Sequence, residues 1–254
     1  MGRVSFAVNM ILTLISVLIT ILISAATVHT GRPWGDAAMK TAIRLFATAI
    51  LLGVLGVIVW RLPVNGWGSL VWVASIVLLT VLRMPHARQT KTNTITDKHA
   101  VSLERVLLAL VAIGGTFVPL IHLATGFFAF ANYRLPDWAV IVGAAILVPA
   151  YWLFWRSHAD LGLNWSVTTE LRAQHDLVTS GVYERIRHPM YAAIWLIFLV
   201  QPLFIHNWIA GLSGPLAFAV MYFVRVPYEE VMMRERFGEA YDAYCKRSGR
   251  LFPR

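Results

Sequence analysis

The sequence predicts an all-α integral membrane protein, a polytopic bundle of about seven transmembrane helices. Hydrophobic residues make up 58% of the 254 residues and charged residues only 14%, whereas about a quarter of the residues of a typical soluble domain are charged. The apolar residues lie in long uncharged blocks rather than in the periodic patterns of soluble helices and strands. Several blocks approach or exceed the length of about 20 residues with which a helix crosses a bilayer core.

Six uncharged runs account for the predicted spans. They are 4–28, 45–60, 62–82, 106–133, 138–155 and 190–224. The last run has 35 residues, too many for one ordinary span at about 1.5 Å per residue, and Gln201-Pro202 and His206-Asn207 interrupt it. We therefore interpret it as a helical hairpin that forms the last two of seven spans, followed by a C-terminal amphipathic tail.

These runs predict three regions along the chain. Residues 1–82 form an N-terminal three-span membrane region, residues 83–105 a polar cytoplasmic linker, and residues 106–254 a membrane region that carries most of the chemically reactive side chains. The single cysteine, Cys245, excludes an internal disulfide framework.

The distribution of charge predicts the orientation of the chain. With seven spans, only Arg3, Arg61 and Arg134 of the 22 basic residues lie on one side of the membrane, and nineteen lie on the other. Basic residues accumulate on the cytoplasmic side, so the N-terminus is expected outside and the C-terminus in the cytoplasm. The net charge of +9 then reflects topology and attraction to membrane lipids, and we expect no nucleic-acid partner.

Residues 1–26 have an alternative interpretation as a cleaved signal peptide. Arg3 precedes the apolar stretch, and Ser24-Ala25-Ala26 resembles a cleavage site. The apolar run is longer than the roughly 7–15 residues of a signal h-region. We therefore expect this segment to be retained.

The polar residues concentrate in the last hundred positions. If the final two spans form a hairpin, Arg187-His188-Pro189 before it and 225–230 after it meet at the same membrane surface. Glu229 and Glu230 lie within about a turn of Arg225, and carboxylates at a membrane edge need partners. The remaining arginines and the lysine of the tail are expected to face lipid headgroups, namely Arg234, Arg236, Lys246, Arg247, Arg250 and Arg254.

Several of these motifs resemble one known family. The stretch 175–183 followed by 187–191 resembles the signature of the isoprenylcysteine carboxyl methyltransferases and, more loosely, of membrane phospholipid methyltransferases. Arg225 with Glu229-Glu230 and the aromatic residues of 237–244 resemble the second half of that signature. The resemblance covers about residues 150–254. Val182 departs from it, because many bacterial relatives have proline there.

This resemblance implies a methyltransferase that uses S-adenosylmethionine, held by a cytoplasmic loop, and acts on a lipid-like or prenylated acceptor. It implies that Arg225 faces an acceptor carboxylate. If the acceptor is an amine, a carboxylate such as Glu230 is chemically the more useful neighbour, so Arg225 and Glu230 are the two catalytic candidates. The residues that it implies for cofactor binding are His175, Asp176, Leu177, Val178, Gly181, Tyr183, Arg187, His188, Pro189, Met190, Tyr191 and Glu229.

The chemistry of methyl transfer is compatible with the residues present. In-line displacement at a sulfonium requires that two partners be positioned and water excluded. No metal site is predicted, because the eight histidines include no pair at ligand spacing. Aromatic faces stabilise a sulfonium, and Tyr183, Tyr191 and Trp165 are candidates.

The acceptor stays open at the level of sequence. The alternatives to the carboxylate of a prenylated cysteine are a free isoprenoid acid, a phospholipid amine and a small thiol. Beyond methyl transfer, the alternative enzyme is a sterol-reductase-like protein that binds NADPH. A transporter or lipid-binding protein is the non-enzymatic alternative. The role of the first three spans and the oligomeric state are not predicted.

Overall fold

The computed structural model describes residues 52–89, 98–162 and 177–254, together with positions 41, 45 and 49. In these ranges the regular elements are helices, accompanied by two isolated β-bridges. The all-α prediction is thus confirmed. Contacts divide the chain into two units, Met1–Gly66 with Leu120–Ala129 and Trp67–Pro119 with Phe130–Arg254, which are described separately.

The described part of the first unit contains a short helix, α3 (Leu62–Asn65), and a turn around Gly126. Arg61 Nε and Asn65 Nδ2 both donate hydrogen bonds to the carbonyl oxygen of Leu123, at 3.0 and 2.8 Å. The predicted span 62–82 is wrong at its start. Helix α3 ends at Gly66, whose positive φ of 74° breaks the helix, and the next helix begins at Gly68.

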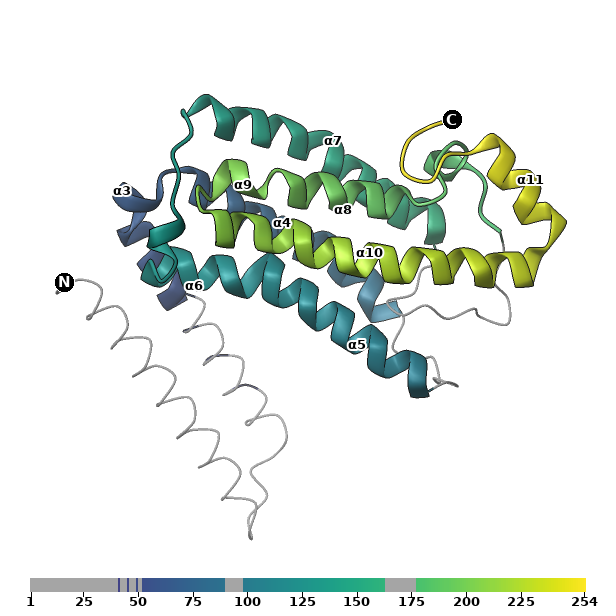
Figure 1. The fold of residues 1–254 in the computed structure, drawn as a ribbon, viewed down its shortest axis with the longest axis horizontal. Coiled ribbons are helices and arrows are strands. Elements are labelled where there is room, and N and C mark those ends of the chain that lie inside the picture. Colours follow the sequence, from purple (N-terminus) through teal and green to yellow (C-terminus); the bar gives the residue numbers. More distant parts are fainter. Residues whose placement is uncertain (1–40, 42–44, 46–48, 50–51, 90–97, 163–176) are drawn as a thin grey trace, which may run out of the picture. The chain divides into compact units, whose positions relative to one another are not determined.

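The second unit holds the remaining helices (Figure 1). They are α4 (Gly68–Gln89), α5 (Lys98–Ala112), the π-helix η2 (Ile113–Phe117), α7 (Trp138–Leu161), the 3-10 turn η5 (Gly181–Tyr183), α8 (Pro189–Leu199), α9 (Gln201–Phe204), α10 (Trp208–Phe237) and α11 (Glu239–Arg247). Helix α6 (Val118–Thr125) and the 3-10 turn η3 (Ala129–Ala131) each include residues of both units.

Three helices among the described residues are long and apolar enough to cross a membrane. They are Ser102–Thr125, Trp138–Leu161 and Trp208–Phe237, and shorter apolar helices occupy Gly68–Arg83 and Pro189–Phe204. The predicted first span and the segment 1–26 lie outside the described residues. Of the predicted second span, 45–60, the structure describes positions 45, 49 and 52–60, and these are helical. The predicted span 106–133 is shifted, because its helix begins at Lys98 and ends at Thr125, before the positive φ of Gly126.

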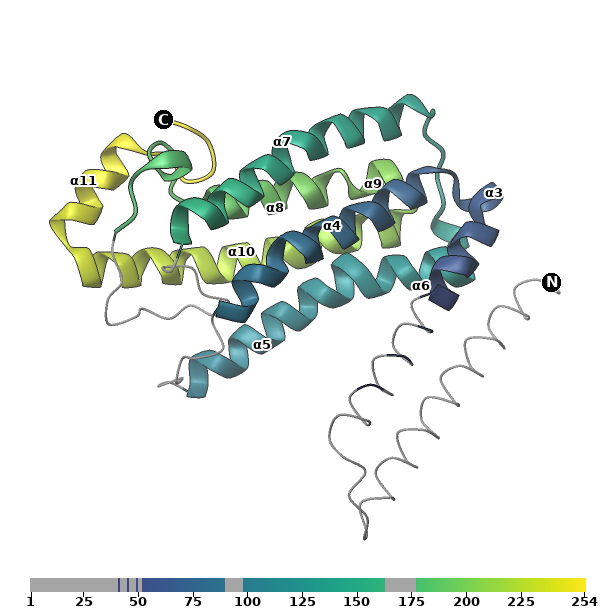
Figure 2. The same ribbon diagram turned by 180° about the vertical axis from the view of Figure 1, so that it is seen from behind.

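Helix α10 packs along α5, η2, α8 and α9, while α7 packs on α8, on α9 and on α4 (Figures 1 and 2). Small residues allow the helices to approach closely. An added Cβ at Gly114 would lie 2.4 Å from the carbonyl oxygen of Ser213, and at Gly143 it would lie 2.7 Å from the ring of Phe204. The backbones of η2 and α10 are therefore in contact at Gly114, and at Gly143 the missing side chain leaves room for the ring of Phe204.

The start and the length of α10 determine what reaches the site. Asn207 caps the helix, since its Oδ1 accepts hydrogen bonds from the backbone amides of Ile209 and Ala210. The helix has 30 residues, or about 45 Å at 1.5 Å per residue, which exceeds a bilayer core of about 30 Å. About ten of its residues therefore exceed the length of an apolar core, and Arg225 is the first charged residue of the helix, so the charged end is the C-terminal one.

Candidate functional site

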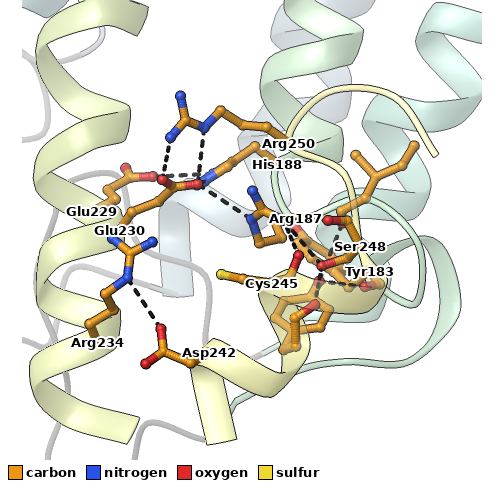
Figure 3. A network of polar contacts seen from close by, with 12 residues as sticks. Tyr183, Arg187, His188, Glu229, Glu230, Arg234, Asp242, Cys245, Ser248 and Arg250 are labelled. Atoms are coloured by element: carbon orange, nitrogen blue, oxygen red, sulfur yellow. Dashed lines mark hydrogen bonds and ion pairs between the residues drawn. The ribbon is translucent and has the colours of Figure 1, made fainter. Parts of the chain in front are cut away.

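A buried carboxylate lies near the C-terminal end of α10. Glu230 is only 3% exposed, and both of its carboxylate oxygens bind Arg250, with Nε 3.1 Å from Oε1 and Nη2 2.5 Å from Oε2 (Figure 3). Arg187 Nε lies 3.4 Å from Oε1, and His188 Nε2 lies 3.4 Å from the same oxygen. Because an isolated buried carboxylate is strongly unfavourable, these partners are what keeps Glu230 charged inside the protein.

The neighbouring carboxylate joins α8, α10 and α5. Glu229 Oε1 accepts a hydrogen bond of 2.8 Å from Arg225 Nε, one turn earlier, and one of 2.7 Å from the hydroxyl group of Tyr191. On its other side, Arg225 Nη1 forms an ion pair of 3.3 Å with Glu104 Oε2 on α5. The expectation that Glu229 and Glu230 have partners is confirmed. We call Glu104, Arg187, His188, Tyr191, Arg225, Glu229, Glu230 and Arg250 the polar cluster.

The residues that follow α11 hold the segment before α8. The backbone amide of Gly249 donates to Arg185 O at 2.9 Å, Arg187 N donates to Gly249 O at 2.8 Å, and His188 N donates to Arg250 O at 3.0 Å. The guanidinium of Arg187 also donates to the carbonyl oxygen of Ser248. We call Ser248–Arg250 the C-terminal strap. It brings the last residues of the chain into the polar cluster.

Helix α11 is fixed by two buried tyrosines. Tyr241 and Tyr244 are 2% and 3% exposed, and the hydroxyl group of Tyr244 donates to the carbonyl oxygen of Tyr183. Burial raises the pKa of Tyr244 to about 12 and raises the pKa values of Tyr241 and Tyr183 as well. The predicted amphipathic tail thus includes a docked helix.

The next residues of the tail contribute a charge to the polar cluster. The hydrogen bonds from Arg250 to Glu230 raise the pKa of Arg250.

The turn η5 rests on the end of α7. Gly181 has a φ of +62°, and an added Cβ would lie 2.2 Å from Oδ2 of Asp160. The same oxygen accepts a hydrogen bond of 2.9 Å from the amide of Val182, and Arg156 pairs with Asp160 at 2.6 Å. Tyr183 donates to Ser157 O at 3.2 Å. Glycine is required here both by its backbone conformation and by the carboxylate beside it.

An aromatic group lies next to the polar cluster, between α8 and α10. The ring of Tyr191 is 5.9 Å from that of Tyr222, and the ring of Trp195 is 5.2 Å from that of Phe218 and 5.8 Å from that of Tyr222. The ring of Tyr191 meets that of His188 edge-on at 5.6 Å. Trp195 Nε1 is buried and has no hydrogen-bond partner in the described part of the chain, so this donor is suited to a polar group of a bound ligand.

The structure brings together only some of the predicted site residues. Arg187, His188, Tyr191, Arg225, Glu229 and Glu230 meet in the polar cluster. Pro189 is the first residue of α8, where proline suits a helix start, and Met190 follows it. Leu177 and Val178 are half-buried, while Gly181 and Tyr183 contact α7. His175, Asp176 and Trp165 lie outside the described residues.

Two members of the polar cluster were not predicted. Glu104 was assigned to the cytoplasmic linker, and its signal in the sequence is a single acid at the start of a long apolar helix. Arg250 was expected to face lipid headgroups. That expectation is wrong, because its guanidinium binds Glu230. No local pattern links Arg250 with Glu230, since the chain must turn through α11 and the strap before the two side chains meet.

Comparison with known proteins gives matches for the same part of the chain. Residues 140–235 match the isoprenylcysteine carboxyl methyltransferase (ICMT) family. A probable protein-S-isoprenylcysteine O-methyltransferase of Oryza sativa subsp. indica is 31% identical over 74 residues, which are 29% of this chain and 39% of the relative. The Homo sapiens protein-S-isoprenylcysteine O-methyltransferase is 35% identical over 89 residues, 35% of this chain and 31% of the relative. Protein-S-isoprenylcysteine O-methyltransferase A of Arabidopsis thaliana is 31% identical over 111 residues, 42% of this chain and 52% of the relative.

Among solved structures, that of the eukaryotic intramembrane Ras methyltransferase ICMT is similar to this chain. Its TM-score is 0.44 at 20% sequence identity, covering 72% of this chain and 62% of that chain. The chain spans about a third to a half of the length of the curated relatives named above. The resemblance predicted from the sequence is confirmed: residues 140–235, which include most of α7, all of α8 and most of α10, match the ICMT family.

Proposed function

We propose that this protein is an S-adenosylmethionine-dependent integral membrane methyltransferase that esterifies the carboxylate of a lipid-like, prenylated acceptor. One observation carries the proposal. The side chains of Arg187, His188 and Tyr191 form ion pairs and hydrogen bonds with Glu229 and Glu230 in a largely buried cluster that also contains Arg225. These residues come from two segments that both lie in the range matching the ICMT family. The proposed topology has seven spans, the last two a hairpin, with the N-terminus outside and the site at the cytoplasmic surface.

The residues around Tyr191 fit the cofactor. When bound, S-adenosylmethionine supplies a methyl group on a positively charged sulfonium. The carboxylate of Glu229 can accept hydrogen bonds from ribose hydroxyls or the amino group, and the buried Nε1 of Trp195 can donate to an acceptor of the ligand. The faces of Tyr191 and Tyr222 suit the sulfonium charge. This aromatic group also excludes water from the transfer.

Arg225 supports a carboxylate acceptor. Two carboxylates from different helices, Glu229 and Glu104, bind its guanidinium at 2.8 and 3.3 Å, which holds its plane in one orientation. A planar guanidinium aligns a carboxylate better than a flexible ammonium does. A carboxylate is itself a sufficient nucleophile toward a sulfonium methyl group, so the residues need only orient it.

Methyl transfer by the purified protein tests this function. The full chain in lipid nanodiscs is incubated with methyl-deuterated S-adenosylmethionine and, in separate reactions, a prenylated cysteine, phosphatidylethanolamine or an alkyl thiol. The expected product is a prenylcysteine methyl ester, which base hydrolyses to deuterated methanol. N-methyl and S-methyl products withstand base, so a base-stable label would contradict carboxyl methylation.

Two variants connect the activity with the site. Arg225→Ala and Glu229→Ala are expected to abolish methyl transfer, and unchanged turnover in both would contradict the site assignment. Calorimetry with S-adenosylhomocysteine and with NADPH distinguishes a methyltransferase from a reductase. Binding of NADPH alone would contradict the proposed cofactor.

A further inference from the structure

The C-terminal strap lies beyond the range that matches the ICMT family, which ends at residue 235, yet it contacts the centre of the polar cluster. We propose that Arg250 is a positioning residue for Glu230, and that docking of the strap completes the site. This inference rests on the proposed function. It assigns a role to the last residues of the chain that the resemblance did not imply.

Arg250 makes the closest contacts to Glu230. Its two nitrogens lie 3.1 and 2.5 Å from the two carboxylate oxygens, whereas Arg187 and His188 each lie 3.4 Å from Oε1 alone. Hydrogen bonds between charged groups are typically about 2.7–2.9 Å long, and a two-point contact fixes orientation as well as distance. Arg250 therefore sets the plane of the Glu230 carboxylate.

The C-terminal strap also holds Arg187 and His188, the other two partners of Glu230. Three backbone hydrogen bonds pair Gly249 and Arg250 with Arg185, Arg187 and His188. The side chain of Arg187 then joins Glu230 to the carbonyl oxygens of Ser248 and Cys245. The C-terminal strap, the segment 185–188 before α8 and the carboxylate of Glu230 thus contact one another, and Figure 3 shows the side-chain contacts among them. We expect these three parts to become ordered together.

Exposure distinguishes Arg250 from an ordinary surface arginine. Its side chain is 48% exposed while Glu230 is 3% exposed, so the guanidinium reaches from the surface to a buried charge. Glu230 adjoins Glu229 in sequence, and His188 lies near both carboxylates, with Nδ1 3.7 Å from Glu229 Oε2. A shift of Glu230 is therefore transmitted through His188 to the carboxylate proposed to hold the cofactor.

Three variants of the full chain in nanodiscs test the proposal. Arg250→Gln removes the charge, Arg250→Lys keeps the charge but not the two-point contact, and Lys246→Gln is the matched control, because it removes one exposed positive charge from the same tail. The readouts are kcat and KM for methyl transfer, the affinity for S-adenosylhomocysteine by calorimetry, and hydrogen exchange of the amides of Arg187 and His188.

We expect Arg250→Gln to lower kcat/KM about tenfold or more, which is the effect of losing a charged hydrogen bond. It should also weaken S-adenosylhomocysteine binding and accelerate exchange at Arg187 and His188. Arg250→Lys should give intermediate values in every readout, and Lys246→Gln should match the wild-type protein.

The proposal is overturned if Arg250→Gln retains wild-type kcat/KM and S-adenosylhomocysteine affinity. A variant that only melts at a lower temperature, with both quantities unchanged, would likewise show a purely structural role. Absence of methyl transfer by the wild-type protein with every acceptor would contradict the proposed function instead. The binding and exchange measurements would still decide the inference in that case.

Discussion

The hydroxyl group of Tyr191 and the carboxylate of Glu229 are joined by a hydrogen bond of 2.7 Å that connects α8 to α10. The accepting oxygen, Oε1, is the one that also accepts from Arg225 Nε. Oε1 of Glu229 thus connects Arg225, which is proposed to face the acceptor, with Tyr191, which belongs to the aromatic group proposed to face the cofactor. Substitutions around this oxygen are therefore informative.

Tyr191→Phe is expected to raise the dissociation constant for S-adenosylhomocysteine about tenfold, since a hydrogen bond to a charged group contributes about 1.5–3 kcal/mol. The ring and its aromatic neighbours stay, so the fold should be retained. Calorimetry checks the affinity, and Tyr228→Phe, at a tyrosine that is 49% exposed, is the control. Equal affinities in the two variants would refute the role of the hydroxyl group.

Glu104→Gln should destabilise the protein by roughly 1–3 kcal/mol, because Arg225 loses a charged partner in a poorly solvated position. The side chains of the pair are 11% and 10% exposed, so water compensates little. Denaturation in detergent micelles measures the effect, with the adjacent exposed Arg105→Gln as control. If Glu104→Gln were as stable as the control, the ion pair would have no energetic importance.

Gly181→Ala should be more destabilising than Gly162→Ala. Both glycines have positive φ, +62° and +53°, but among the described residues the new Cβ would meet another group, Asp160, only at Gly181. A left-handed conformation alone costs about 1–2 kcal/mol for a residue with a Cβ. The difference in melting temperature between Gly181→Ala and Gly162→Ala therefore measures the effect of the steric clash between the new Cβ and Asp160. Adding Asp160→Ala to Gly181→Ala should reduce that difference, and no reduction would argue against Asp160 as its cause.

Docking of α11 is expected to weaken at alkaline pH. The pKa of Tyr244 is about 12 in the folded protein, above the value of about 10 for an exposed tyrosine. The folded state therefore binds the proton more tightly, and its stabilisation is complete below about pH 10 and is lost as the pH rises toward about 12. Denaturation at several pH values measures this slope. In Tyr244→Phe the slope should be shallower, and an unchanged slope would exclude Tyr244 as its origin.

Part of the site was predictable because its residues lie close together in the chain. Arg225 and Glu229 are four positions apart, so a helix places them on one face, and their ion pair follows directly. The meeting of Arg187 and His188 with Glu230 required in addition that the chain turn back at His206-Asn207. That turn was visible as polar residues in an apolar run.

Other features depended on backbone geometry that hydropathy does not encode. The predicted span 62–82 overlooked the break at Gly66, and the predicted span 106–133 overlooked the turn at Gly126. Uncharged composition shows that a segment is stable in lipid, but it does not show where a positive φ ends the helix. Span boundaries were therefore less accurate than the prediction of helices itself.

The sequence by itself determined the helical membrane class, the family resemblance and the concentration of reactive side chains in the C-terminal hundred residues. The membrane class and the concentration of reactive side chains follow from composition and from patterns within a few turns of helix, whereas the resemblance follows from the motifs of 175–191 and 225–244. Only the tertiary structure decided that Glu104 holds Arg225 and that Arg250 holds Glu230. Such pairs form because a buried charge must have a partner, and which partner it has depends on how α5, α10 and the C-terminal strap pack.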